Sequence, residues 1–336
     1  MYDWAEFRHF RYLLKILEKR GFRLAAEELF TSQPNLTVQA RQFQDNASVR
    51  LFHKTNSGQI VPTKAGIAFV VLTRNLLEFR DEVIDAVVSI ERNEISAVRL
   101  GSTSLVDESV FRRFCALHKE LLPACVIRPT HGDTSQLVQE VLTGIVDAAI
   151  VTLPLANSDL HIEELRRERI VVCLREDHPL AAKAAVPISE LQNSLTIFYN
   201  PERHPEAHKR LLELLRDVGI FVEDFSRASH PSEMQSLVKE GHGLALIREG
   251  TPLLGNLVTR PIIGVDWTMD TAIIYRKDSH PRVIPALVRT LKRQIMKADK
   301  KSALSLVQQA QKPGAKGSAE AAEEVPVQLS FSEEIV

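Results

Sequence analysis

A run of polar side chains lies between residues 32 and 41. Ser32 is a good N-cap and Pro34 suits the first turn of a helix, so a helix is predicted from about Gln33 to Asp45. Hydroxyl, amide and guanidinium groups on the outer face of a helix are the groups that read base edges in the DNA major groove. The side chains expected on or near that face are Ser32, Gln33, Asn35, Thr37, Gln39 and Arg41.

Hydroxyl residues also follow predicted strands further along the chain. Ser102, Thr103 and Ser104 come after the strand Val98–Gly101, and Thr152 comes after Ala148–Val151. Thr134 and Ser135 precede a helix that begins near Gln136. Hydroxyls and N–H groups at helix starts bind anions, and open α/β sheets bind ligands at the carboxyl ends of their strands. Each hydroxyl could instead be a plain helix cap.

Catalytic and metal-binding patterns are weak. The sequence has none of the motifs GxGxxG, GxxxxGK[ST], GxSxG and HExxH. His204 and His208 have the spacing of metal ligands on a helix, but no further ligand is placed to join them, so no metal and no cofactor are expected. The three cysteines, Cys115, Cys125 and Cys173, form no CxxC pair and are predicted to be core residues, with redox sensing as the alternative.

The segments around the polar residues 32–41 are predicted to form a small helical domain. Leu13, Leu14 and Leu17 recur on one helix face that Gly21 is expected to end, and a short helix follows at about 24–29. A hairpin is predicted over 54–61, with Asn56-Ser57-Gly58 as its turn. One long helix is expected from Thr63 to Arg92, and its spacing of three and four predicts a dimer seam, with packing on its own domain as the alternative. The seam residues are Phe69, Leu72, Leu76, Phe79, Val83, Ala86 and Ile90.

From Ala97 onward, β-type runs alternate with amphipathic helical runs, which predicts a largely parallel α/β architecture. Its roughly 200 residues suit two lobes. The predicted domains are 1–63, the linker helix 64–93 and the α/β domain 94–298; lobe I takes about 94–165 and 267–298, and lobe II about 166–266. Residues 299–336 are predicted to be a disordered acidic tail.

Charge and hydropathy agree with a nucleic-acid-binding N-terminal domain. The 336-residue chain has a net charge of −1, yet residues 1–63 hold nine Lys and Arg against six Asp and Glu. The N-terminus has no cationic segment followed by an apolar core, and no apolar run approaches the roughly 18 residues of a spanning helix. A cytoplasmic location and no membrane partner are therefore expected.

Several motifs together resemble the LysR-type transcriptional regulators. Residues 22–37 read FRLAAEELFTSQPNLT, close to the family's SFxxAAxxLxxSQPALS helix-turn-helix. Residues 49–54 and 62–66 resemble its VRLFxR and LTxAG segments, and 177–181 and 240–247 continue the likeness. The chain departs from the pattern at Asn35, at Val38, where the family often has Arg, and at 46–48, so no operator sequence is carried over. Apolar Val38 could contact a thymine methyl group or weaken binding.

The resemblance implies a winged helix-turn-helix, a linker helix and a two-lobed effector domain like type II periplasmic binding proteins. It implies that base-facing positions are Ser32, Gln33, Pro34 and Thr37 and that Lys54 contacts phosphate. Arg23, Asn35, Val38 and Arg41 are predicted to belong to the DNA interface with them. The implied effector-binding residues are Ser102, Thr103, Ser104, Thr134, Ser135, Thr152, Tyr199, Asn200 and Pro201. The implied partners are double-stranded DNA, a small-molecule effector and further copies in a homodimer or homotetramer, with RNA polymerase as a candidate.

The sequence therefore predicts a ligand-responsive transcription factor and not an enzyme. One alternative is a constitutive regulator without a physiological effector. The other is an enzyme or solute-binding domain with a DNA-binding appendage. A small anion, such as a carboxylate, is the expected effector at the two hydroxyl-rich helix starts.

Overall fold

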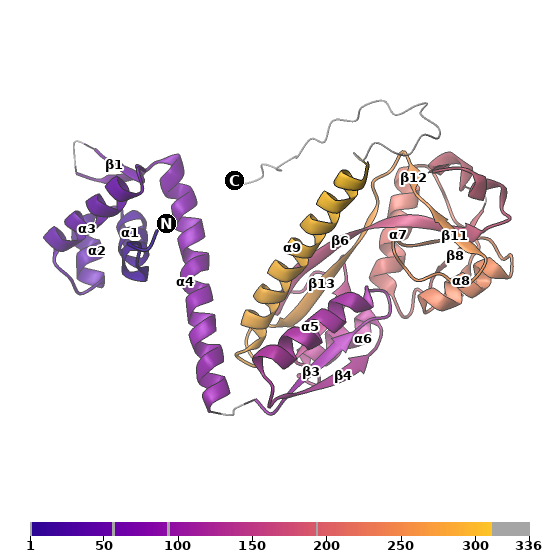
Figure 1. The fold of residues 1–336 in the computed structure, drawn as a ribbon, viewed down its shortest axis with the longest axis horizontal. Coiled ribbons are helices and arrows are strands. Elements are labelled where there is room, and N and C mark those ends of the chain that lie inside the picture. Colours follow the sequence, from indigo (N-terminus) through magenta and orange to yellow (C-terminus); the bar gives the residue numbers. More distant parts are fainter. Residues whose placement is uncertain (1, 56–57, 93–94, 193, 311–336) are drawn as a thin grey trace. The chain divides into compact units, whose positions relative to one another are not determined.

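The structure is a computed structural model that describes residues 2–55, 58–92, 95–192 and 194–310, with side chains as far as Asp299 (Figure 1). The predicted turn residues Asn56 and Ser57 and the segment 311–336 lie outside the described residues.

The N-terminal domain is a helix-turn-helix with a two-stranded wing. It comprises α1 (Phe7–Lys19), α2 (Phe22–Glu28), α3 (Gln33–Asn46), β1 (Phe52–Lys54) and β2 (Ile60–Pro62), and β1 and β2 pair antiparallel. Small residues let α2 and α3 approach closely, since Ala25, Ala26 and Ala40 are all buried. The core also contains Leu13, Ile16, Leu17, Phe22, Leu36, Phe43, Leu51 and Ile60.

The end of α1 differs from the sequence prediction. Arg20, not Gly21, takes the left-handed conformation there, with φ of 50°. Gly21 is extended and serves as the N-cap of α2. A tertiary contact explains the exchange, because the N–H of Ile60 in the wing donates to the carbonyl oxygen of Arg20 at 3.0 Å. That bond stabilises Arg20 in the left-handed conformation, which glycine most often adopts at the end of a helix.

The linker helix α4 (Lys64–Glu91) begins at a cap that also joins it to the wing. The Thr63 hydroxyl accepts from the Gly66 N–H at 3.0 Å and donates to the Arg50 carbonyl at 2.7 Å. Gly66 packs so closely that a Cβ atom there would lie 1.9 Å from the carbonyl oxygen of Leu51. The Thr and Gly of the LTxAG-like segment are therefore explained by the junction of wing and linker.

The predicted seam of α4 contains buried, half-buried and exposed residues, and Leu76 and Phe79 are among the half-buried ones. Phe69 packs into the N-terminal domain, where its ring stacks on Phe10 at 5.9 Å, and Ala86 is buried. Leu72, Val83 and Ile90 remain exposed. Four apolar residues outside the predicted seam are exposed with them: Ile67, Val71, Ile84 and Val87. A dimer seam on α4 stays a prediction, and its exposed apolar face is wider than the heptad alone suggested.

Lobe I of the C-terminal domain is built on parallel strands. β3 (Ala97–Ser102) pairs in parallel with β4 (Val126–His131) and with β5 (Ala148–Thr152), and β13 (Thr268–Arg276) runs antiparallel beside β5. α5 (Glu108–Leu121) and α6 (Thr134–Leu142) are the helices of this lobe (Figure 1). Each follows a strand directly, so both helix starts lie at the carboxyl ends of strands.

Lobe II repeats this arrangement. β8 (Leu195–Tyr199) pairs in parallel with β9 (Ser226–Ala228) and β10 (Leu244–Arg248), and its helices are α7 (Pro205–Asp217) and α8 (Pro231–Lys239). β11 (Leu257–Arg260) pairs with the end of the long strand β6 (Leu160–Arg175), and the short strands β7 (Val186–Pro187) and β12 (Ile262–Ile263) pair with each other. Short 3-10 helices span Pro179–Ala182 and Ile188–Glu190.

One strand, β6 (Leu160–Arg175), links the two lobes. It pairs with β13 up to Arg169 and with β10 from Ile170, both antiparallel. The sequence predicted only its second half, Ile170–Leu174, as a strand, and antiparallel β6 and β13 make the sheet mixed at its centre.

The last described element is α9 (Ile284–Ala310). The prediction that a disordered tail begins at residue 299 was therefore wrong. Residues 299–310 are helical, because the Ala-, Leu- and Lys-rich composition of this segment has high helix propensity. The remainder of the predicted tail, 311–336, lies outside the described residues.

Candidate functional sites

Seven of the predicted DNA-interface residues lie at the start of α3 or along it. Ser32, Gln33, Pro34, Asn35, Val38 and Arg41 are exposed, and Thr37 is half-buried. Ser32 caps the helix by accepting from the Asn35 N–H at 3.3 Å, and the Thr37 hydroxyl donates to the Gln33 carbonyl at 2.9 Å. Among the described residues, none forms a hydrogen bond with the side-chain amide of Gln33, so this amide is available for a base edge.

The basic residues of the predicted DNA interface are held only loosely. Arg23 pairs with Glu27 at 3.1 Å and Arg41 with Asp45 at 3.5 Å, both at exposed positions one helical turn apart. Lys54 of the wing lies over the Phe22 ring, 4.8 Å from its centroid. Such exposed pairs contribute at most about 1 kcal/mol, so these cations can exchange their partners for phosphates.

A cleft of about 960 Å³ in the C-terminal domain combines residues of both lobes. Lobe I contributes the turn after β3 and the start of α5, and lobe II contributes the ends of β8, β9 and β10 and the start of α8. Of the predicted effector-binding residues, Ser102, Thr103, Ser104 and Tyr199 line it.

The other predicted effector-binding residues do not line this cleft. Thr134 and Thr152 are buried, and their hydroxyl oxygens lie 3.4 Å from each other. Ser135 is exposed, and Asn200 and Pro201 are half-buried beside the cleft residue Tyr199. Asn200 is occupied locally, because its side-chain oxygen accepts from the Glu202 N–H at 2.9 Å.

Arg248 is the principal cleft residue that sequence reasoning missed. It ends β10, and its side chain is only 9% exposed. Its Nη1 donates to Glu168 Oε1 at 3.1 Å, and the Thr271 hydroxyl donates to the other Glu168 oxygen at 3.1 Å. The rule that selected Ser102, a polar residue at the carboxyl end of a strand, would have found Arg248 if it had been applied to β10 as well.

A chain of alternating charges extends from this pair. Arg166 lies 2.9 Å from Asp107 and 3.8 Å from Glu168. Burial raises the pKa of Asp107, but bonds from Ser109 and the charges of Arg248 and Arg166 outweigh burial, so the pKa lies below its ordinary value. Burial is the largest effect on Glu168 and leaves its pKa above the ordinary value.

Two buried polar atoms of cleft residues have no hydrogen-bond partner among the described residues. They are the hydroxyl of Thr103, which is 2% exposed, and the Nε of Arg248. A buried polar group without a partner costs about 1–3 kcal/mol. Because one belongs to each lobe and both residues line the same cleft, a bound polar ligand would relieve both costs together.

His204, the N-cap of α7, and His208 within this helix are both packed against other parts of lobe II. His204 Nε2 lies 2.9 Å from the Ser229 carbonyl oxygen, and the His208 ring packs against Phe198 and Phe225. Burial lowers the pKa of both histidines. Among the residues that the structure describes, no three His, Cys, Asp or Glu side chains are grouped to hold a metal.

Comparison with known proteins decides the family. Residues 92–295 match the family described as the LysR substrate binding domain, and residues 7–67 match the bacterial regulatory helix-turn-helix proteins of the lysR family. The chain belongs to the LysR family. It is a transcriptional regulator that joins a DNA-binding helix-turn-helix to an effector-binding domain.

Named relatives in this family cover most of the chain. The regulator BudR of Raoultella terrigena is 26% identical over 83% of this chain and 97% of its own length. AlsR of Bacillus subtilis is 25% identical over 83% of this chain and 93% of its own length. Full-length BenM has the same fold, with a TM-score of 0.56 at 22% identity over 88% of this chain and 98% of that chain.

A further solved relative has been captured on DNA. CbnR in complex with its target DNA has a TM-score of 0.51 at 19% identity over 87% of this chain and all of that chain.

In the described part of the present chain, no helix combines the length and apolarity needed to cross a membrane.

Proposed function

We propose that this LysR-type regulator responds to a small anion, such as a carboxylate, bound between Arg248 and the Ser102–Ser104 turn. The observation that carries the proposal is the buried guanidinium of Arg248, whose Nε lacks a partner at the cleft. Charge-assisted hydrogen bonds to a carboxylate are about twice as strong as neutral ones. The regulator would act in the cytoplasm, with access to DNA and RNA polymerase, and not as an enzyme.

The two sides of the proposed site belong to different lobes, which gives the ligand a means of control. A ligand shifts a conformational equilibrium only by as much as it binds one state better than the other. An anion that contacts Ser104 and Arg248 together would favour the lobe arrangement that brings them within bonding distance. The buried residue Tyr199 of β8 also lines the cleft, from the lobe II side.

Small carboxylates test the proposal directly. The thermal stability of the full chain would be measured with acetate, benzoate, succinate and citrate, and with spermidine as a cation, at constant ionic strength. The carboxylate that stabilises most would then be titrated by calorimetry. Ser104→Ala should weaken its binding about ten- to hundredfold, since a bond to a charged group contributes roughly 1.5–3 kcal/mol.

Ser135→Ala is the matched control, because Ser135 is an exposed serine at a helix start that does not line the cleft. It should bind like the parent protein. Stabilisation by spermidine alone, or equal affinity in the two serine variants, would remove the proposed site.

A second prediction concerns DNA reading by α3. Gln33→Ala should cost about 1–3 kcal/mol and relax base choice at one position of each half-site, because a bidentate amide contact is lost. Lys54→Ala should weaken binding to all sequences equally and reduce the salt dependence, because a phosphate contact carries no sequence information. Selection of binding sites from a random DNA library, followed by affinity measurement, distinguishes the two. Unchanged base preference in Gln33→Ala would contradict the assignment.

Peroxide sensing is disfavoured as a second function, although relatives include the hydrogen peroxide-inducible genes activator of Escherichia coli at 25% identity. Burial raises the pKa of Cys115 and Cys125, and it raises that of Cys173 to about 12. The thiolate is the reactive form, so all three thiols are poorly suited to rapid oxidation.

A further inference from the structure

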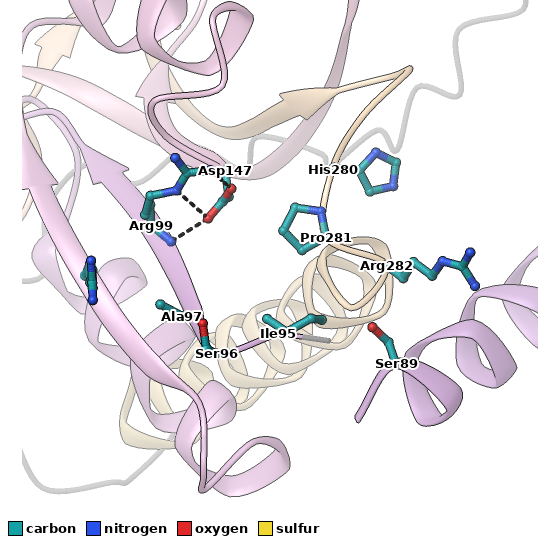
Figure 2. A pocket seen from close by; sticks show the side chains of 10 residues that line it. Ser89, Ile95, Ser96, Ala97, Arg99, Asp147, His280, Pro281 and Arg282 are labelled. Atoms are coloured by element: carbon teal, nitrogen blue, oxygen red, sulfur yellow. Dashed lines mark hydrogen bonds and ion pairs between the residues drawn. The ribbon is translucent and has the colours of Figure 1, made fainter. Parts of the chain in front are cut away.

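A second pocket, of about 490 Å³, lies at the opposite end of the lobe I strands from the effector cleft. Figure 2 shows it bounded by the Ser96–Ala97 segment at the start of β3, by Arg99 and Asp147, and by the His280–Arg282 segment that precedes α9. Arg128 of β4 and Ser89 in the last turn of α4 complete the lining.

Like charges face this pocket from neighbouring strands. Arg99 and Arg128 are in register on the parallel strands β3 and β4, so their side chains leave the same face of the sheet. Asp147 neutralises only one of them: its carboxylate accepts from the backbone N–H, the Nε and the Nη2 of Arg99, at 2.7, 3.1 and 2.5 Å. Arg128 is exposed and forms no ion pair with the described residues.

Two further features add positive potential. Arg282 also lines the pocket, and its Nη1 lies 3.7 Å from Asp85 Oδ1 of α4, at the long end of an ion pair. The N-terminus of α9 begins just after it, where the helix dipole disfavours a cation and favours an anion. Burial, the largest influence, lowers the pKa of His280, although its Nδ1 lies 2.8 Å from the Arg276 carbonyl oxygen, a contact that raises the pKa. Three guanidiniums therefore line the pocket against the single carboxylate of Asp147.

We infer that this pocket is a second, independent anion site, which takes a small metabolite bearing a phosphate or carboxylate group. The volume suits such a ligand. β3 separates Ala97 here from Ser102 in the cleft by roughly 17 Å, at about 3.3 Å per residue, so one small ligand cannot occupy both sites. The anion binds Arg128 and the unpaired edge of Arg99, and the Ser96 hydroxyl lies beside them. Because Ser89 of the linker helix lines the same pocket, the ligand contacts both α4 and lobe I.

Pyrophosphate and succinate are suitable probes, since they separate the two sources of negative charge. The melting temperature of the full chain would be measured with each, up to about 10 mM and at ionic strength matched with chloride, because a ligand of the native state raises stability with its concentration. At least one probe should raise the melting temperature. Arg128→Gln should then bind that probe about ten- to hundredfold more weakly by calorimetry, as expected for loss of a charge-assisted bond.

Two variants separate this pocket from the cleft and from general charge effects. Arg112→Gln removes an exposed arginine that lines the cleft, and Ser104→Ala alters the proposed effector site. Both should retain the binding that Arg128→Gln loses, whether or not the effector proposal holds. The second site is overturned if neither probe stabilises the parent protein, if Arg128→Gln binds both probes normally, or if pyrophosphate binding is lost in Ser104→Ala instead.

Discussion

Replacement of Leu72 and Val87 by glutamate is expected to convert an oligomer of this chain into monomers. Both side chains belong to α4 and are exposed, Leu72 by 68% and Val87 by 59%. Exposed apolar residues recur along this helix, and burying them against a second copy is the most economical way to remove them from water. Two carboxylates in such a contact, repeated by the symmetry of a dimer, should weaken association at least about a hundredfold.

Sedimentation of the doubly substituted chain over a range of concentrations measures this effect. Leu72→Glu is preferred to Leu76→Glu, because Leu76 is half-buried and its loss could also disturb the monomer. Phe221→Glu is the matched control: Phe221 is also 68% exposed but lies in lobe II, away from α4. If the α4 variant stays as oligomeric as the parent protein, the helix is not the dimer seam.

Local sequence signals predicted the N-terminal domain well because each of its elements is specified by its own residues. The Ser32 cap and Pro34 fix the start of α3, and the Thr63 cap fixes the start of α4. The exception at Arg20 and Gly21 has a non-local cause, the bond from Ile60 in the wing. Periodicity alone could not show that Phe69 belongs to the domain core, because its partners Phe10 and Phe43 lie in other helices.

The two-lobed domain was predictable in its strand and helix alternation but not in its central strands. The first half of β6 reads LHIEELRRER, which is too charged to resemble a buried strand. It forms one because β13 pairs with it over its whole length, and its charges find partners such as Asp107 and Lys292. Non-local pairing of this kind leaves no period in the sequence.

Only some of the residues that line the cleft between the lobes were predicted from the sequence. The rule that ligands bind at strand ends selected Ser102, Thr103 and Ser104, which line this cleft. It could not separate hydroxyls that face the cleft from those, such as Thr134 and Thr152, that face each other beneath the surface. The charge network around Arg248 was hidden because Glu168 is 80 residues away in sequence.

Arg248→Met is expected to destabilise the unliganded protein strongly. The substitution introduces an apolar side chain of similar length and takes the nearer cationic partner from the carboxylate of Glu168, which is 7% exposed, so that only Arg166 remains, 3.8 Å away. Removing one member of a buried ion pair costs about 3–5 kcal/mol. For a domain of this size that is a fall of roughly 6–20 °C in Tm, at about 2–4 °C per kcal/mol.

The stability lost in Arg248→Met should become smaller at low pH. The direction of this pH dependence follows from the pKa of Glu168. Burial already raises its pKa above the ordinary value, and removal of Arg248 takes away the largest opposing influence. The folded variant therefore binds a proton more tightly than the unfolded chain does. Its stability rises as the pH falls through the raised pKa towards the ordinary value of 4.5. Adding Glu168→Gln to Arg248→Met should restore most of the Tm and abolish this pH dependence. Melting curves at about pH 5.5 and pH 8 test both points, and an Arg248→Met deficit that is equal at the two values would show that Glu168 is not the group left uncompensated.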